Sequence, residues 1–166
     1  RIQSIEEGKR QGGVVWHTQG SGKSLTMAML AKKIYLTVKN PKIILVTDRT
    51  NLDTQITDTF KNVDVPVHNA KTGNQLVDLL QSKSDEVVTK IINKVEAAVN
   101  QLGSTPLESN NIFVMIDEGH RTQYGTFNVK MQKVLPNACF LAFTGTPLMK
   151  KEKSTAQKFG GIIDAY

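Results

Sequence analysis

The stretch that decides the fold runs from residue 13 to residue 39 and begins Gly13-Val14-Val15-Trp16-His17-Thr18-Gln19-Gly20-Ser21-Gly22-Lys23-Ser24. The apolar run 13–16 predicts a buried strand, and apolar residues at helical spacing predict a helix from Ser24 to about Lys39. A strand, a glycine-rich turn ending in Lys-Ser, and a helix form the context that a phosphate-binding loop requires. The sequence therefore predicts that this turn cradles the phosphates of a nucleotide.

The residue types in this turn suit that chemistry. Glycines let backbone N–H groups turn inward around phosphates, and the N-terminus of the helix adds donors and a favourable dipole. Lys23 can reach the terminal phosphates and serve catalysis, and the Ser24 hydroxyl can ligate Mg²⁺. The predicted cofactors are ATP and Mg²⁺. The predicted nucleotide-binding residues are Gly20, Ser21, Gly22, Lys23 and Ser24.

Further apolar runs alternate with helix-like stretches along the rest of the chain. The predicted strands cover residues 42–47, 63–68, 87–92, 112–116 and 138–143, with 63–68 the weaker candidate. Helices are predicted from Thr50 toward Phe60, where Thr50-x-x-Asp53 looks like a capping box, and over residues 73–81. The residues expected near one face of the first helix are Leu25, Ala28, Met29, Lys32 and Leu36. Continuous apolar strands separated by helices indicate an α/β fold, a mostly parallel sheet with helices on both faces.

An acidic pair, Asp117-Glu118, ends the most apolar of these strands. Opposite a phosphate loop, one carboxylate of such a pair holds the Mg²⁺ shell and the next orients and deprotonates the attacking water. We assign the metal to Asp117 and the base to Glu118. Acidic pairs after strands are common, so this assignment depends on the phosphate loop that precedes it.

Three further residues are candidates for coupling the phosphate site to the next strand and to a bound polyanion. His120 lies two residues beyond the predicted base, although a histidine there is also compatible with a surface turn. Thr144 and Thr146 follow the last predicted strand in the tight turn Thr144-Gly145-Thr146-Pro147. Small hydroxyl residues on such a turn suit a switch that contacts both His120 and the bound polyanion.

A candidate DNA contact follows the second strand, at Asp48-Arg49-Thr50. Sheets of this kind bind ligands beyond the carboxyl ends of their strands, so Arg49 and Thr50 would lie on that edge and contact a phosphate backbone. The alternative is a surface arginine and a helix cap made by Thr50, and the two functions can coexist.

Composition bounds the other possibilities. The chain has 166 residues, 39% hydrophobic and 22% charged, which suits one soluble globular domain. No apolar run is long enough for a membrane span. The single cysteine, Cys139, excludes a disulfide framework and suits a cytoplasmic setting. We expect Cys139 to be a buried strand residue. The net charge of +6 favours a polyanionic partner. The first residue is Arg1, so we expect a piece of a longer chain.

These blocks, in this order, resemble the first motor lobe of superfamily-two DNA translocases and helicases, with the three-layer RecA-like P-loop fold. Trp16–Met27 looks more specifically like the phosphate loop of the restriction (R) subunit of type I restriction-modification enzymes, which carries histidine at the position of His17. Residues 46–56, 117–125 and 142–148 look like its next motifs, and Thr89 lies in a weaker match to a DNA-side motif. Gly119 departs from the alanine or cysteine usual in the acidic box.

This resemblance implies a larger machine than these residues contain. It implies an ATP-dependent translocase that moves double-stranded DNA by backbone contacts before cleavage, with a second motor lobe and a nuclease domain in the same chain and with methylation and specificity subunits as partners. We expect residues 1–166 to form one lobe, with 1–12 as a lead-in and 149–166 as the start of a link to the second lobe. The isolated lobe should scarcely hydrolyse ATP, because an arginine from the second lobe is missing.

Two alternatives stay open. One is the motor lobe of another superfamily-two helicase, from repair or from another restriction type. The other is an ATP-responsive interaction module that does not hydrolyse, although an intact Asp117-Glu118 pair argues against it.

Overall fold

The structure of this chain is a computed structural model, and it describes residues 5, 8, 10–18, 20–47, 50–82, 84, 86–91, 95, 97–100, 105–117, 123–145 and 162–165. Within these ranges, residues 50–55, 86, 88–91, 123–127 and 162–165 are described by their backbone alone.

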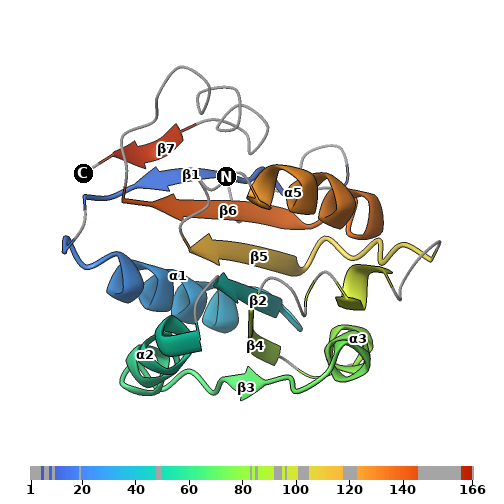
Figure 1. The fold of residues 1–166 in the computed structure, drawn as a ribbon, viewed down its shortest axis with the longest axis horizontal. Coiled ribbons are helices and arrows are strands. Elements are labelled where there is room, and N and C mark those ends of the chain that lie inside the picture. Colours follow the sequence, from blue (N-terminus) through green and yellow to red (C-terminus); the bar gives the residue numbers. More distant parts are fainter. Residues whose placement is uncertain are drawn as a thin grey trace.

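The centre of the molecule is a sheet of seven strands in the order β3-β4-β2-β5-β6-β1-β7 (Figure 1). The strands are β1 Gly13–Trp16, β2 Lys42–Thr47, β3 His68–Asn69, β4 Glu86–Ile91, β5 Ile112–Asp117, β6 Cys139–Thr144 and β7 Ile162–Ala165. Every neighbouring pair is parallel. The predicted parallel α/β architecture is therefore confirmed.

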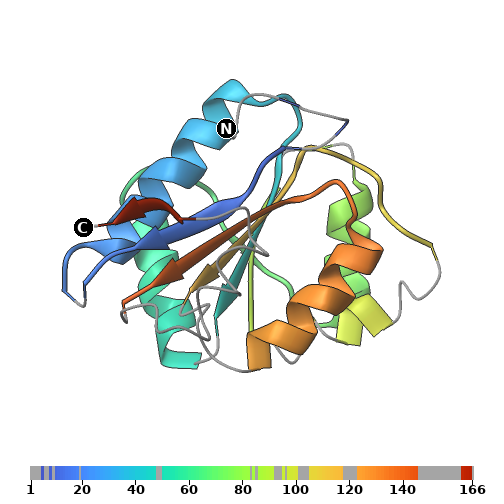
Figure 2. The same ribbon diagram turned by 90° about the horizontal axis from the view of Figure 1, so that it is seen from above.

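Helices cover both faces of this sheet, which gives three layers (Figure 2). The helices are α1 Lys23–Thr37, α2 Thr50–Lys61, α3 Gly73–Gln81 and α5 Gln123–Val134. Helices α1 and α2 lie on one face, and α3 and α5 lie on the other, together with a short helical stretch at residues 97–100. The strand β5 shows why both faces are covered, since its six residues are all buried.

The alternation of side chains along β5 divides the core into two clusters. Ile112, Val114 and Ile116 pack on the face of α3 and α5, and Phe113 and Met115 pack on the face of α1 and α2. A continuous apolar strand is thus the pattern of a strand that needs a partner on each side. All five side chains are at most 1% exposed, so β5 lies in the centre of the core.

Three elements differ from the sequence-based prediction. The strand expected over residues 63–68 is reduced to His68–Asn69, because Pro66 lacks an N–H donor and the preceding Asp64 has a left-handed backbone with φ 55°. Helix α5 was not predicted, since Gly125 weakens its helical propensity and the polar Asn128 lies on its buried face. Strand β7 was not predicted either, and it pairs with β1 from within the segment expected to be a link.

The buried face of α1 also differs from the prediction. The sheet covers Met27, Ala28, Ala31 and Ile34, each at most 2% exposed. Of the five residues predicted to lie near one face of this helix, only Ala28 lies in that buried group. The alanines at 28 and 31 allow the helix to approach the sheet closely, which favours this face over the opposite one.

The amino end of the sheet is fastened by Arg10, which the sequence places in the lead-in. Arg10 is 8% exposed. Its Nε donates to the Asn110 carbonyl at 3.0 Å, and its Nη2 donates to Asn111 Oδ1 at 2.9 Å. The guanidinium also lies over the Phe113 ring, 5.5 Å from its centroid. Asn111 in turn donates to the Lys39 carbonyl at 2.9 Å, so one cluster joins three segments that are distant in sequence.

The cysteine behaves as a core residue. Cys139 is fully buried in β6, and burial raises the pKa of its thiol to about 12. The thiol therefore stays protonated at neutral pH, which confirms the prediction of a buried strand cysteine. Among the described helices, none combines the length and apolar character needed to cross a membrane.

Candidate nucleotide-binding site

The candidate site lies at the carboxyl edge of the sheet, where β1, β5 and β6 end side by side. The register pairs Trp16 with Thr144 and Asp117 with Phe143, so the last residues of the three strands are close neighbours. Parallel strands place all their carboxyl ends at one edge, which is where open α/β sheets bind ligands. The phosphate loop leaves β1 at this edge and leads directly into α1.

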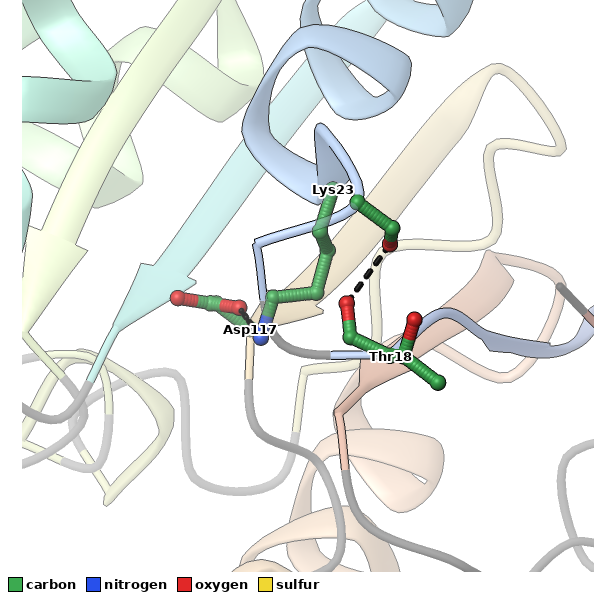
Figure 3. Close-up of polar contacts among 4 residues, drawn as sticks. Thr18, Lys23 and Asp117 are labelled. Carbon is green, nitrogen blue, oxygen red and sulfur yellow. Dashed lines mark hydrogen bonds and ion pairs between the residues drawn. The ribbon is translucent and has the colours of Figure 1, made fainter.

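The backbone of the loop depends on its glycines. Gly20 has φ 85° and Gly22 has φ 83°, both in the left-handed region that other residues adopt only at a cost. The turn closes on itself, because the Ser21 amide donates to the Thr18 carbonyl at 3.1 Å. The Ser21 hydroxyl donates to the same carbonyl at 2.6 Å, the contact drawn at Thr18 in Figure 3. The sequence did not predict that the Thr18 carbonyl accepts these bonds. Every residue has a backbone carbonyl, so the residue type does not show which one accepts.

The first turn of α1 is open to an anion. Gly22 is the N-cap and offers no side-chain cap, and the first turn contains no acidic residue. The Gly22 carbonyl accepts from the Thr26 amide at 3.0 Å, which begins the helix directly after the loop. The uncapped amides and the helix dipole together favour negative charge at this point. Ser24 is the second residue of the helix, so its side chain starts from the same turn.

An ion pair crosses from the loop to the acidic strand end. Lys23 Nζ lies 2.9 Å from Asp117 Oδ1, and Figure 3 shows the lysine side chain reaching toward the end of β5. The side chains are 16% and 6% exposed, respectively. A carboxylate buried to this extent requires a nearby cation, because desolvation of an isolated charge is costly. The fold therefore creates a cation position beside Asp117, and Lys23 fills it.

This arrangement fits a magnesium nucleotide. Asp117 and the Ser24 hydroxyl are oxygen donors of the kind that Mg²⁺ takes, and the metal ordinarily completes its shell with phosphate oxygens and water. The glycines leave open space, since a Cβ added at Gly20 or Gly22 would meet no atom within 4 Å. The described residues contain no cluster of three or more His, Cys, Asp or Glu side chains that could hold a metal on its own.

The loop is joined to the end of β6 through the backbone. The His17 amide donates to the Thr144 carbonyl at 3.0 Å, one residue beyond the strand pairing of Trp16 with Thr144. His17 is 7% exposed and Thr144 is 1% exposed, so this junction is buried. The link between these two motifs could not be read from the sequence, because strand pairing over such a separation leaves no local signal.

The remaining predicted residues are placed only in part. Glu118, His120, Thr146 and Arg49 lie outside the described residues. Thr50 is the first residue of α2, which follows β2 at the carboxyl edge. Thr89 lies within β4, where it pairs with Leu45 on one side and with Asn69 on the other. The assignments of all site residues to ATP, Mg²⁺ and DNA stay predictions.

Comparison with known proteins identifies the family. The family of SWI2/SNF2 ATPases matches residues 1–166, the whole chain. The chain belongs to this family. It is 39% identical over 183 aligned residues to the type I restriction enzyme HindI endonuclease subunit of Haemophilus influenzae, covering 97% of this chain. It is 36% identical over 160 residues to the putative type I restriction enzyme MjaIXP endonuclease subunit of Methanocaldococcus jannaschii, covering 95% of this chain. The resemblance seen in the motifs is thereby confirmed.

The SWI2/SNF2 ATPase lobe is a small part of these relatives. It spans 17% of the HindI subunit and 15% of the MjaIXP subunit. Solved structures match its fold. The helicase domain of Pyrococcus furiosus Hef matches with a TM-score of 0.67 and 17% identity, and the match covers 96% of this chain and 35% of the Hef chain. A nuclease-deletion mutant of the Type ISP restriction-modification enzyme LlaGI, with a TM-score of 0.61 and 15% identity, covers 86% of this chain and 16% of that one. The RecA-like fold is thus confirmed.

Proposed function

We propose that this lobe binds ATP and Mg²⁺ and couples ATP hydrolysis to movement along DNA in the restriction subunit of a type I restriction enzyme. The observation that carries the proposal is the 2.9 Å ion pair between Lys23 of the phosphate loop and Asp117 of β5. These residues come from the two sequence blocks that a nucleotide hydrolase needs, and the sheet brings them to one point. The comparison with type I endonuclease subunits supports the choice of machine.

The chain's own residues divide the chemistry between them. ATP supplies the phosphoryl group that is transferred to water, and Mg²⁺ neutralises charge on the phosphates. Lys23 orients and stabilises the terminal phosphates, and the amides of the loop hold the others. Asp117 and Ser24 hold the metal, and Glu118 orients the attacking water and takes its proton. The buried setting of Asp117 strengthens its attraction for a cation.

Coupling to DNA is proposed for the strand ends beside the nucleotide. The backbone link between His17 and Thr144 supports the proposal that Thr144 responds to the state of the phosphate loop, together with His120 and Thr146. The proposed DNA-backbone contacts are Arg49, Thr50 and Thr89. A translocase must pass every sequence, so its contacts should be to phosphate and sugar rather than to base edges.

The parent protein is proposed from its relatives. Its chain would carry a nuclease domain and a second motor lobe, and it would act in the cytoplasm with methylation and specificity subunits on double-stranded DNA. The solved LlaGI enzyme is in complex with a DNA substrate mimic, which supports DNA as the polyanion to which a chain of net charge +6 is suited.

The test is the ATPase activity of the full-length parent with and without unmethylated DNA. A motor should show turnover that DNA stimulates, since DNA engagement completes the catalytic arrangement. Tight nucleotide binding without turnover would instead support an ATP-responsive interaction module. Stimulation by single-stranded DNA alone would favour a different superfamily-two helicase.

A further inference from the structure

Helix α1 carries an apolar row on the side that faces away from the sheet. The row consists of Leu25, Met29 and Leu36, which are 54%, 55% and 70% exposed and which we name the α1 stripe. At about 100° per residue the three side chains fall within roughly 40° of one another around the helix, and the row is about 16 Å long. The three residues are therefore aligned along one side of the helix, with Lys32 between Met29 and Leu36.

The stripe is unusual for this lobe. The described residues contain five exposed large hydrophobic side chains, and three of the five are in the stripe. The other two, Ile5 and Val129, occur singly on other segments. Single exposed apolar residues are normal on a protein surface, whereas an aligned row marks a surface that another segment covers.

Helix α1 is therefore apolar on two opposite sides, with its inner side already buried against the sheet. That distribution is typical of a helix packed on both sides. We propose that the α1 stripe is covered by a helix from another part of the parent polypeptide, with an apolar contact face and acidic residues along its flanks.

The charge around the stripe specifies the flanks of this partner helix. Lys32 and Lys33 follow Met29 along the same side of α1, and α1 contains no acidic residue. Lys32 does approach Asp64, at 3.9 Å, but Asp64 is 93% exposed and such a surface pair contributes little. A basic border around an apolar row is best complemented by acidic side chains, which fix the register of a docked helix.

The length of the relatives indicates that the partner belongs to the same chain. The lobe spans 17% and 15% of the HindI and MjaIXP subunits, so a parent of similar length has most of its residues outside the lobe. A segment tethered to the lobe has a much higher effective concentration at α1 than a separate molecule does. A second copy or a separate subunit is therefore a weaker candidate.

The first test is oxidation of methionine in the full-length parent by dilute peroxide, read by mass spectrometry. Met27 and Met29 lie on opposite sides of α1, with Met27 fully buried and Met29 about half exposed. If the stripe is covered, Met29 should oxidise at least about tenfold more slowly than in the denatured protein, as Met27 does, because oxidation requires access to the sulfur. Oxidation of Met29 at the denatured rate would overturn the proposal.

A matched pair of variants tests the cause of this protection. Leu36→Gln should raise the oxidation rate of Met29 roughly tenfold, because loss of one buried leucine contact loosens the docked helix. Val129→Gln changes an equally simple exposed position on α5 and should leave the rate unchanged. Continued slow oxidation of Met27 shows that each variant is folded. An equal response to both substitutions would contradict a specific contact at the stripe.

The second test identifies the occupant. A carbodiimide joins lysine amines to carboxylates in direct contact, so Lys32 and Lys33 should form crosslinks to acidic residues outside 1–166 of the same chain. A mixture of isotopically labelled and unlabelled parent distinguishes crosslinks within a chain from those between chains. Crosslinks confined to Asp64, to a second copy or to another subunit would overturn the assignment. Neither test requires ATP or DNA, so their failure is distinguishable from failure of the proposed function.

Discussion

Two cations lie at opposite ends of one strand and serve the molecule differently. Arg10 lies over Phe113, the second residue of β5, whereas Lys23 pairs with Asp117, the last residue of β5. The two ends are roughly 13 Å apart at about 3.3 Å per residue. Arg10 donates to a backbone carbonyl and to an amide oxygen and lies over an aromatic ring, three neutral groups. Lys23 instead forms an ion pair with a buried carboxylate.

This difference shows how one fold separates structural from exchangeable contacts. A guanidinium bonded in two directions to fixed neutral acceptors gains nothing from a ligand, so it fastens the chain. A lysine that forms an ion pair with a carboxylate can exchange that partner for a phosphate, while the carboxylate exchanges the lysine for a metal ion. The comparison therefore predicts that Lys23 governs activity and that Arg10 governs stability.

The largest expected effect is the loss of activity in Lys23→Ala. Turnover of ATP by the full-length parent should fall by at least about 10³-fold, because no other side chain of the loop places a cation at the terminal phosphates. Lys33→Ala, an exposed lysine on the same helix, is the matched control and should retain turnover. Steady-state ATPase assays with saturating DNA measure both. Near-normal turnover in Lys23→Ala would remove the phosphate-loop assignment.

The next largest expected effect separates nucleotide binding from ATP hydrolysis at the carboxyl edge of the sheet. Glu118→Gln should keep ATP and Mg²⁺ binding but slow hydrolysis by about 10²- to 10⁴-fold, because the amide keeps the shape and loses the base. Single-turnover hydrolysis and equilibrium nucleotide binding measure the two parts. A hydrolysis rate constant equal to that of the unmodified parent would mean that the base lies elsewhere.

The opposite end of β5 should respond in stability instead. Arg10→Met should lower the free energy of unfolding by about 2–3 kcal/mol, because it removes two charge-assisted hydrogen bonds and leaves their part-buried acceptors without this donor. Arg10→Lys keeps the charge but cannot donate in the two directions of a guanidinium, so the free energy of unfolding should fall by a smaller amount. Denaturant unfolding measures the change. A selective loss of ATP turnover in the folded Arg10→Met protein would break the distinction between the two ends.

The smallest effect concerns DNA. Arg49→Ala should weaken DNA binding by a similar factor on unrelated sequences and should reduce the slope of log affinity against log salt by about one. Affinity measured on two unrelated duplexes at several salt concentrations provides the comparison. A loss confined to one duplex would contradict a backbone contact.

The sequence by itself determined the local elements and the chemistry they carry. Strands Gly13–Trp16 and Lys42–Thr47 and helix Gly73–Gln81 have the predicted bounds, because continuous apolar runs and flanking Gly and Pro residues act locally. The glycine-rich turn of the phosphate loop was also predicted from the sequence. Gly20 and Gly22 have positive φ, which glycine adopts without steric cost. The functions predicted for Glu118 and Arg49 rest on the sequence and on its resemblance to the restriction-subunit family alone.

Only the tertiary structure decided which of these elements meet. The order β2-β5-β6-β1 places Asp117 beside Lys23 and Thr144 beside His17, contacts between segments that are far apart in the chain. The inner face of α1, strand β7 and the burial of Arg10 were likewise hidden, because each depends on the shape of a distant partner. A side chain's neighbours are set by packing of the whole sheet, and sequence periodicity reports only that a face is apolar, not what covers it.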